Sequence, residues 1–121
     1  STDEITMPDF DLFHTTEDYY STELHELVHW TKAKARCDRD LGRDQTGYAK
    51  EELVAELGSA FLMAMLGLES QPRQDHAQYL ASWLNVLKAD NDAIFKAASK
   101  ASAAAQYLQD LQVTDAAKIA A

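Results

Sequence analysis

The chain of 121 residues contains a single cysteine, Cys37, and has no long hydrophobic run. One thiol cannot form an internal disulfide, so we expect a protein of the reducing cytoplasm. No apolar stretch approaches the roughly 20 residues that a membrane-spanning helix requires. The acidic start, STDEITMPDF, lacks the basic and then apolar pattern of a signal peptide, and the missing initial Met indicates a fragment or a processed chain.

Basic residues are also scarce, because 11 Lys and Arg stand against 20 Asp and Glu and give a net charge of -9. An acidic domain repels phosphate, so we expect this chain alone to bind nucleic acid poorly. Five of the eleven Lys and Arg fall in residues 32–43, KAKARCDRDLGR. This segment is interpreted as a solvated loop, with a local contact to phosphate or to an acidic partner as the alternative.

The sequence shows no internal repeat and no linker, which predicts a single domain over residues 1–121. Residues 1–14 favour an extended segment with one short edge strand. Helical spacing of apolar residues then predicts four to five helices. Their expected starts are Thr15 or Thr16, Thr46 or Gly47, Asp75, Asp90 and, for a short last helix, Thr114. The predicted fold class is therefore mainly α, with at most a short N-terminal strand element.

The second of these helices is expected to lie at the centre of the domain. From Leu53 to Leu68 it is apolar nearly all round, which is typical of a buried helix. Gly67 is a suitable C-terminal stop for it.

The most informative segment is His25-Glu26-Leu27-Val28-His29, which matches the HExxH pattern of zinc metallopeptidases. Residues four apart on a helix lie on the same face, so His25 and His29 can direct two imidazole nitrogens at one ion. Glu26 lies beside them, where it can take a proton from a metal-bound water. A chance match on a helix surface is the alternative, but this pattern lies in a predicted helix among apolar packing residues.

A catalytic zinc site needs three protein ligands and one open position, so a third ligand must come from elsewhere in the chain. Glu52 and Glu56 share a face of the second predicted helix, and Glu56 is the only charged residue between Leu53 and Leu68. A carboxylate in such surroundings is unfavourable unless it meets a metal or a hydrogen-bonded cation. We expect one of these glutamates to bind the metal and the other to accept a hydrogen bond from a ligand histidine. Glu51 is expected to point about 100° away from Glu52 around the helix axis.

The order of these motifs is similar to that of the glutamate zincins, in which HExxH on one helix is followed by E-x-x-x-D or E-x-x-x-E on the next. This similarity assigns Glu52 to the metal and Glu56 to the position behind a ligand histidine, and the reverse assignment stays open. A buried salt bridge from Glu56 to Arg36 or Lys50 is a further alternative.

Two residues of the third predicted helix, His76 and Tyr79, are three apart and can face one direction. Either could stabilise the oxyanion that forms when water attacks a carbonyl. The alternative places His76 in solvent at the first turn of its helix and Tyr79 in the core. His14 and Cys37 are not assigned to the site.

Several blocks beyond HExxH are similar to one known family. The blocks are DYYSTELHELVHWT (18–31), LGR (41–43), YAKEELVAELGSAFL (48–62) and HAQYLASWLNVLKADNDAIFKAASKA (76–101). Together they resemble the C-terminal zincin-like domain of the ArdC-type antirestriction proteins, which conjugative plasmids and mobile elements carry. The same domain appears in the polyvalent proteins of phages and plasmids. The resemblance spans nearly the whole chain.

This resemblance implies a compact zincin-like metallopeptidase fold and a role in protecting incoming DNA from host restriction. It implies that His25, His29 and an acid of the EELVAE motif bind the metal, with Glu26 as the catalytic acid/base. It also implies an N-terminal domain that binds single-stranded DNA and lies outside these 121 residues.

We therefore expect a zinc-dependent peptidase domain that acts on a peptide or protein substrate, with host restriction or defence proteins among the candidates. Zinc would lower the pKa of its bound water toward ~7, and Glu26 would pass the water's proton to the leaving amine. Sites of this ligand type also bind Mn²⁺, Co²⁺ or Ni²⁺. The alternative hypothesis is a metal-stabilised binding module that cuts no peptide and supports DNA protection or docks onto a restriction enzyme. No membrane partner is expected.

Overall fold

The structure, a computed structural model, describes the backbone of residues 3–69 and 77–120 and the side chains of residues 3–69 and 83–112. It consists of a short 3-10 helix, η1 (Phe10–Leu12), and four α-helices, α1 (Thr16–Trp30), α2 (Gln45–Met65), α3 (Ala77–Ala89) and α4 (Ala93–Ala120). The prediction of a mainly α fold with four to five helices is confirmed, with four α-helices in the described residues.

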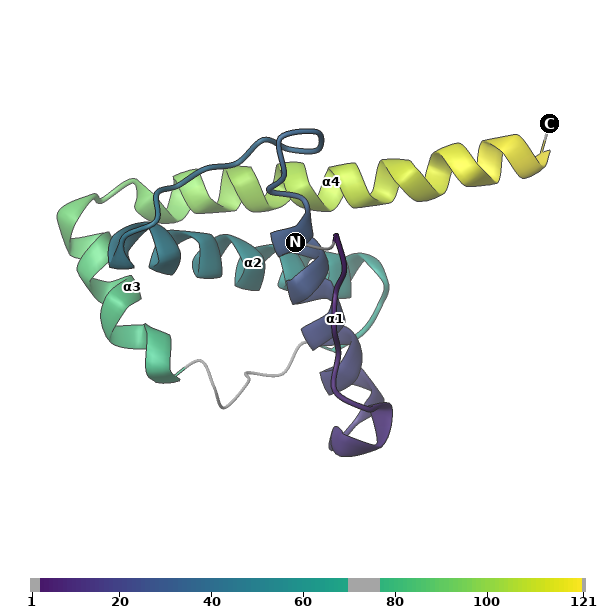
Figure 1. The fold of residues 1–121 in the computed structure, drawn as a ribbon, viewed down its shortest axis with the longest axis horizontal. Coiled ribbons are helices and arrows are strands. Elements are labelled where there is room, and N and C mark those ends of the chain that lie inside the picture. Colours follow the sequence, from purple (N-terminus) through teal and green to yellow (C-terminus); the bar gives the residue numbers. More distant parts are fainter. Residues whose placement is uncertain (1–2, 70–76, 121) are drawn as a thin grey trace.

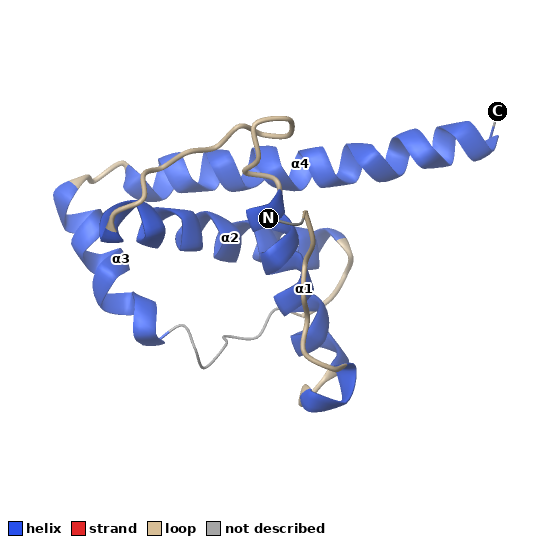
Figure 2. Cartoon of the chain, viewed as in Figure 1, coloured by secondary structure: helices blue, strands red, loops and turns tan. Residues whose placement is uncertain are grey.

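The short strand expected within residues 1–14 is not found. Residues 3–9 form an irregular segment that leads into η1, and the described parts of the chain contain helices and loops without a β-strand (Figure 2). A strand is stabilised by the ladder it forms with a neighbour. With no second strand in the described residues to pair with, the alternating pattern of residues 1–14 has nothing to form a ladder against.

The first two helix starts follow from their capping residues. The side chain of Thr15 accepts a hydrogen bond of 3.0 Å from the N–H of Asp18, as expected for the start of α1. α2 begins one residue before the expected Thr46, because the carboxylate of Asp44 accepts a hydrogen bond of 2.8 Å from the N–H of Gly47. Asp44 therefore caps this helix.

Gly67 ends α2 as predicted. Its φ of +72° is in the left-handed region, and the N–H of Leu68 bonds back to the carbonyl of Met63. The separate last helix expected from Thr114 is wrong, because α4 continues unbroken to Ala120 and its sequence holds no Gly or Pro that would stop it. The expected capping box at Asp75 lies outside the described residues.

α2 lies at the centre of the fold and contacts all three other α-helices. α4 runs alongside α2 and extends beyond it, while α1 crosses α2 and α3 packs near its N-terminal end (Figure 1). The main core forms where α1, α2 and α4 meet, around the fully buried Val28, Val54 and Ala101. None of the described helices is both long and apolar enough to cross a membrane.

A glycine allows α1 and α2 to approach each other closely. A Cβ atom built at Gly58 would lie 2.8 Å from Cγ2 of Val28, which is closer than real side chains pack. Val28 lies between the two histidines of HELVH. Beside it, the hydroxyl of Ser59 donates a 2.8 Å hydrogen bond to the carbonyl of Ser21. The close approach therefore brings the histidine face of α1 against the glutamate face of α2.

Candidate metal centre

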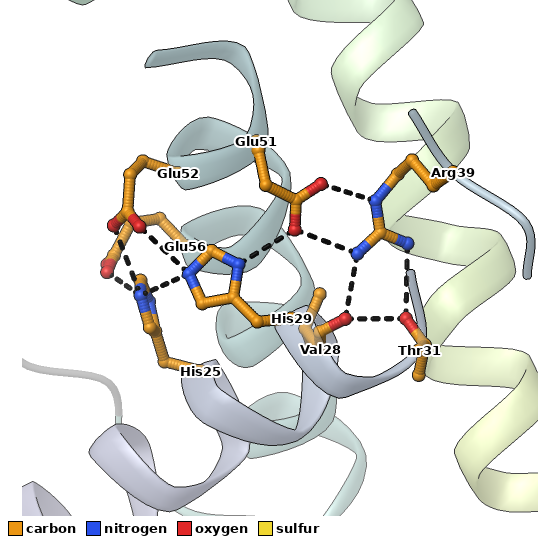
Figure 3. Close-up of polar contacts among 8 residues, drawn as sticks. All are labelled: His25, Val28, His29, Thr31, Arg39, Glu51, Glu52 and Glu56. Atoms are coloured by element: carbon orange, nitrogen blue, oxygen red, sulfur yellow. Dashed lines mark hydrogen bonds and ion pairs between the residues drawn. The ribbon is translucent and has the colours of Figure 1, made fainter. Parts of the chain in front are cut away.

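Three potential ligand atoms converge where α1 crosses α2. His25 Nε2 lies 3.2 Å from Glu52 Oε2, and His29 Nε2 lies 2.9 Å from Glu52 Oε1. The two Nε2 atoms are 3.0 Å apart, and Figure 3 shows both rings turned toward Glu52. Among the described residues, His25, His29 and Glu52 form a group whose ligand atoms all lie within 4.8 Å of one another.

The outer nitrogen of each histidine is held by a further glutamate of α2. His25 Nδ1 lies 2.6 Å from Glu56 Oε1, and His29 Nδ1 lies 2.7 Å from Glu51 Oε2 (Figure 3). An ionised carboxylate only accepts hydrogen bonds, so this arrangement assigns the ring proton to Nδ1 in both histidines. Each ring then presents the lone pair of Nε2 to the point where the three ligand atoms meet.

These residues fit a divalent metal ion. Two Nε2 lone pairs and a carboxylate, separated by 2.9–3.2 Å, repel one another unless a cation lies between them. Two imidazole nitrogens and one carboxylate oxygen are the ligands of a catalytic zinc site, and Mn, Co and Ni accept the same set. His25 and Glu52 are buried, at 5% and 7% exposure, so water compensates this repulsion poorly.

In the metal-free chain a proton takes the place of that cation. Burial alone would lower the pKa of His29, but hydrogen bonds to Glu51 and Glu52 outweigh it and raise this pKa to about 9. Burial would raise the pKa of Glu52, but hydrogen bonds to His25 and His29 outweigh it and lower this pKa to about 2. His29 is therefore protonated and Glu52 ionised at neutral pH.

Metal affinity should consequently rise with pH. A metal ion must displace the proton on His29, so its apparent affinity should increase about tenfold per pH unit up to pH 9 and then level off. Calorimetric titration with Mn²⁺ between pH 6.5 and 9 measures this slope. An affinity that is flat across this interval in the unmodified chain would contradict the prediction.

Glu26, the expected acid/base, lies beside the centre and outside its converging ligand atoms. It is partly buried and lines a cavity of about 310 Å³ together with His29. The cavity lies between the C-terminal half of α1 and residues 3–6, and Trp30 and Arg36 also line it. The carboxylate of Glu26 is therefore available to a molecule that enters this cavity.

The two residues expected on the third helix add nothing to this geometry. His76 lies outside the described residues, and the side chain of Tyr79, in α3, lies outside them as well. Their expected contact with a substrate oxyanion stays a prediction. His14 is exposed, and Cys37 lies in the loop after α1 with its N–H bonded to the carbonyl of Thr31. Neither belongs to the converging group.

Glu51 points in a different direction from Glu52, as expected, but it still contacts a histidine of the site, which the sequence interpretation did not foresee. Glu51 and Glu52 are consecutive on α2, and their different directions place them on opposite nitrogens of the His29 ring. Burial raises the pKa of Glu51, but hydrogen bonds to Arg39 and His29 outweigh it and hold the pKa below its ordinary value. The sequence did offer a signal for this arrangement in the adjacent Glu51 and Glu52. One imidazole ring has two nitrogens, and each can form a hydrogen bond with a separate carboxylate.

The role of Arg39 was not predicted either, because residues 32–43 were interpreted as a solvated loop. Its side chain is 3% exposed, and its Nε lies 2.6 Å from Glu51 Oε1. For the alternative of a salt bridge from Glu56 to Arg36 or Lys50, the structure instead pairs Arg36 with Asp3 at 2.9 Å and Glu56 with His25 at 2.6 Å.

The site residues all lie within a recognised family region. A family model described as a zincin-like metallopeptidase matches residues 1–100. The chain belongs to this family. The resemblance that the sequence blocks indicated is thereby confirmed, and so is the zincin-like fold class.

This zincin-like metallopeptidase domain has curated relatives that are much longer than itself. It is 47% identical over 114 residues to the uncharacterized protein y4eC of Sinorhizobium fredii, an alignment that covers 93% of this chain and 37% of that protein. It is 48% identical over 103 residues to a DNA primase TraC of Escherichia coli, covering 84% of this chain and 10% of the primase. The chain thus spans well under half the length of these relatives.

Two crystal structures of the antirestriction protein ArdC from plasmid R388 are also similar to this zincin-like domain. The Mn(II)-bound ArdC structure is 46% identical with a TM-score of 0.76, and the match covers 86% of this chain and 39% of ArdC. The metal-free ArdC structure is 46% identical with a TM-score of 0.77, and the match covers 89% of this chain and 39% of ArdC.

Proposed function

We propose that this chain is a divalent-metal-dependent peptidase domain of the HExxH type. The observation that carries the proposal is the convergence of His25 Nε2, His29 Nε2 and the Glu52 carboxylate at one point, with Glu26 on the adjoining cavity. These three residues would hold the ion, and Glu56 would position His25 from behind. Zinc is favoured by the ligand types, and the Mn(II)-bound state of ArdC supports a site that also takes manganese.

The proposed chemistry divides between the ion and the side chains. A bound divalent ion would polarise the substrate carbonyl and lower the pKa of a water molecule. Glu26 accepts a proton from the attacking water and donates it to the leaving amine. The peptide enters the cavity that Glu26 and His29 line. His76 and Tyr79 stay candidates for stabilising the oxyanion.

We also propose an antirestriction role on a conjugative plasmid or another mobile element. The 46% identity to ArdC from plasmid R388 supports it. The substrate would be a protein of the recipient's cytoplasm, such as a restriction or defence protein. The net charge of -9 disfavours binding of single-stranded DNA by this domain itself.

The test is the metal dependence of peptide cleavage. Treatment with a chelator should abolish cleavage of an unfolded protein such as reduced casein, and added Zn²⁺ or Mn²⁺ should restore it. Cys37→Ser is the matched control, because it removes the chain's only thiol and should cut and reload like the unmodified protein. A reloaded chain that binds metal and cuts no peptide would contradict the peptidase proposal and favour the metal-stabilised binding module.

A further inference from the structure

Arg39 is a buried arginine with a fixed set of acceptors. Its Nε and Nη2 donate to the two carboxylate oxygens of Glu51, at 2.6 and 3.0 Å. Nη2 also donates to the carbonyl of Val28 at 2.8 Å, and Nη1 donates to Thr31 Oγ1 at 3.1 Å. The guanidinium is therefore held at the C-terminal end of α1 and faces α2 (Figure 3).

The carboxylate of Glu51 joins Arg39 to His29. Its Oε2 accepts hydrogen bonds from Arg39 Nη2 and from His29 Nδ1, the latter at 2.7 Å. A two-point contact between a guanidinium and a carboxylate fixes the plane of the carboxylate as well as its distance. The direction of Oε2 in turn fixes the rotation of the His29 ring, and with it the direction of Nε2.

Arg39 also supplies the charge that Glu51 needs in this position. Glu51 is partly buried, with a side chain that is 13% exposed, and a buried carboxylate without a cation is strongly unfavourable. Without the guanidinium, the carboxylate would be free to turn toward solvent and away from the histidine. The ring of His29 would then lose the partner that aims it.

We propose that Arg39 is a positioning residue of the metal centre, which sets metal affinity by holding Glu51 against His29. This inference rests on the proposed metal site and is independent of whether that site cuts peptides. It gives the basic segment 32–43 a function beyond solubility, because the segment's one buried arginine completes the support of a ligand on α1.

Arg36 provides a matched control within the same segment. Its Nε donates to the carbonyl of Trp30 at 2.8 Å, so it too binds the C-terminal end of α1. Its carboxylate partner, however, is Asp3 at 2.9 Å, in the segment before η1, whereas the carboxylate partner of Arg39 is Glu51 on α2. The two arginines therefore differ in whether their carboxylate partner touches a ligand histidine.

The experiment measures metal affinity in folded variants by competition of Zn²⁺ and Mn²⁺ against a chromophoric chelator. Arg39→Ala should weaken binding by about 10–100-fold, the range seen when a partner behind a metal ligand is lost. Arg36→Ala should stay within about twofold of the unmodified chain. Arg39→Lys keeps the charge without the two-point geometry and should recover only part of the loss. If Arg39→Ala is unfolded by circular dichroism, Arg39→Lys and Arg39→Gln carry the comparison.

A double-variant cycle separates positioning from general support. Glu51→Gln should weaken metal binding to an extent similar to that of Arg39→Ala. The double variant should bind metal no more weakly than the single variant with the lower affinity, because both substitutions act through one contact. Unchanged affinity in Arg39→Ala, an equal loss in Arg36→Ala or fully additive losses would overturn the inference. An unmodified chain that binds neither metal would overturn the proposed function as well, whereas binding without cleavage would sink only the peptidase.

Discussion

Replacing Glu26 with glutamine should lower peptide hydrolysis by about 10²–10⁴-fold, the usual contribution of a positioned general acid/base. Metal affinity should stay within about twofold of the unmodified chain, because Glu26 is not among the converging ligand residues. An amide has nearly the shape of the carboxylate and cannot accept the proton of the attacking water. The expected variant is thus metal-loaded, folded and inactive.

The measurement pairs turnover of a peptide substrate with calorimetric metal binding. Glu23→Gln, on the same helix, is the matched control, because Glu23 contacts Tyr19 and should leave both quantities unchanged. Undiminished cleavage by Glu26→Gln would remove the acid/base role. In a longer antirestriction protein that contains this domain, survival of DNA protection in the same variant would show that protection does not depend on hydrolysis.

Glu52→Gln should abolish measurable binding of Zn²⁺, whereas Glu56→Gln should weaken it by about 10–100-fold. Glu52 presents both carboxylate oxygens to the inner nitrogens of His25 and His29, at 3.2 and 2.9 Å. Glu56 contacts the outer nitrogen of His25 at 2.6 Å and therefore acts on the ion only through that ring. Removing a direct metal ligand should therefore lower metal affinity more than removing a residue that only supports a ligand.

The comparison is made by titrating Zn²⁺ into both variants at one pH. Each substitution removes one negative charge from the same helix one turn apart, so a difference between them reports position and not net charge. A larger loss in Glu56→Gln than in Glu52→Gln would reverse the assignment, which the sequence alone had left open.

The histidines and two of the glutamates of the site could be predicted from helical periodicity. A spacing of four puts His25 and His29 on one face, and the structure places their Nε2 atoms 3.0 Å apart. The same spacing puts Glu52 and Glu56 on one face of α2, and each contacts a histidine. Local pattern was sufficient here because every one of these residues lies on a helix.

Arg39 could not be predicted in this way, because a loop has no period that says which side chains turn inward. The preceding residue, Asp38, has a φ of +49°, and the N–H of Arg39 bonds back to the carbonyl of Lys32. This local turn directs Arg39 toward Glu51, which is 12 residues later in the chain. The composition of a basic segment carries no information about such a turn.

The contact between Gly58 and Val28 bears on which ions the domain can accept. Neither residue offers a ligand atom, yet their close approach brings the helix that carries the histidines against the helix that carries Glu52. Zinc bonds nitrogen at about 2.0–2.1 Å, and calcium needs oxygen at about 2.3–2.6 Å with more ligands. A methyl group at position 58 would push α1 outward and loosen the fit for a small ion. The spacing of the proposed metal ligands would thus depend partly on the missing side chain of a residue that never meets the metal.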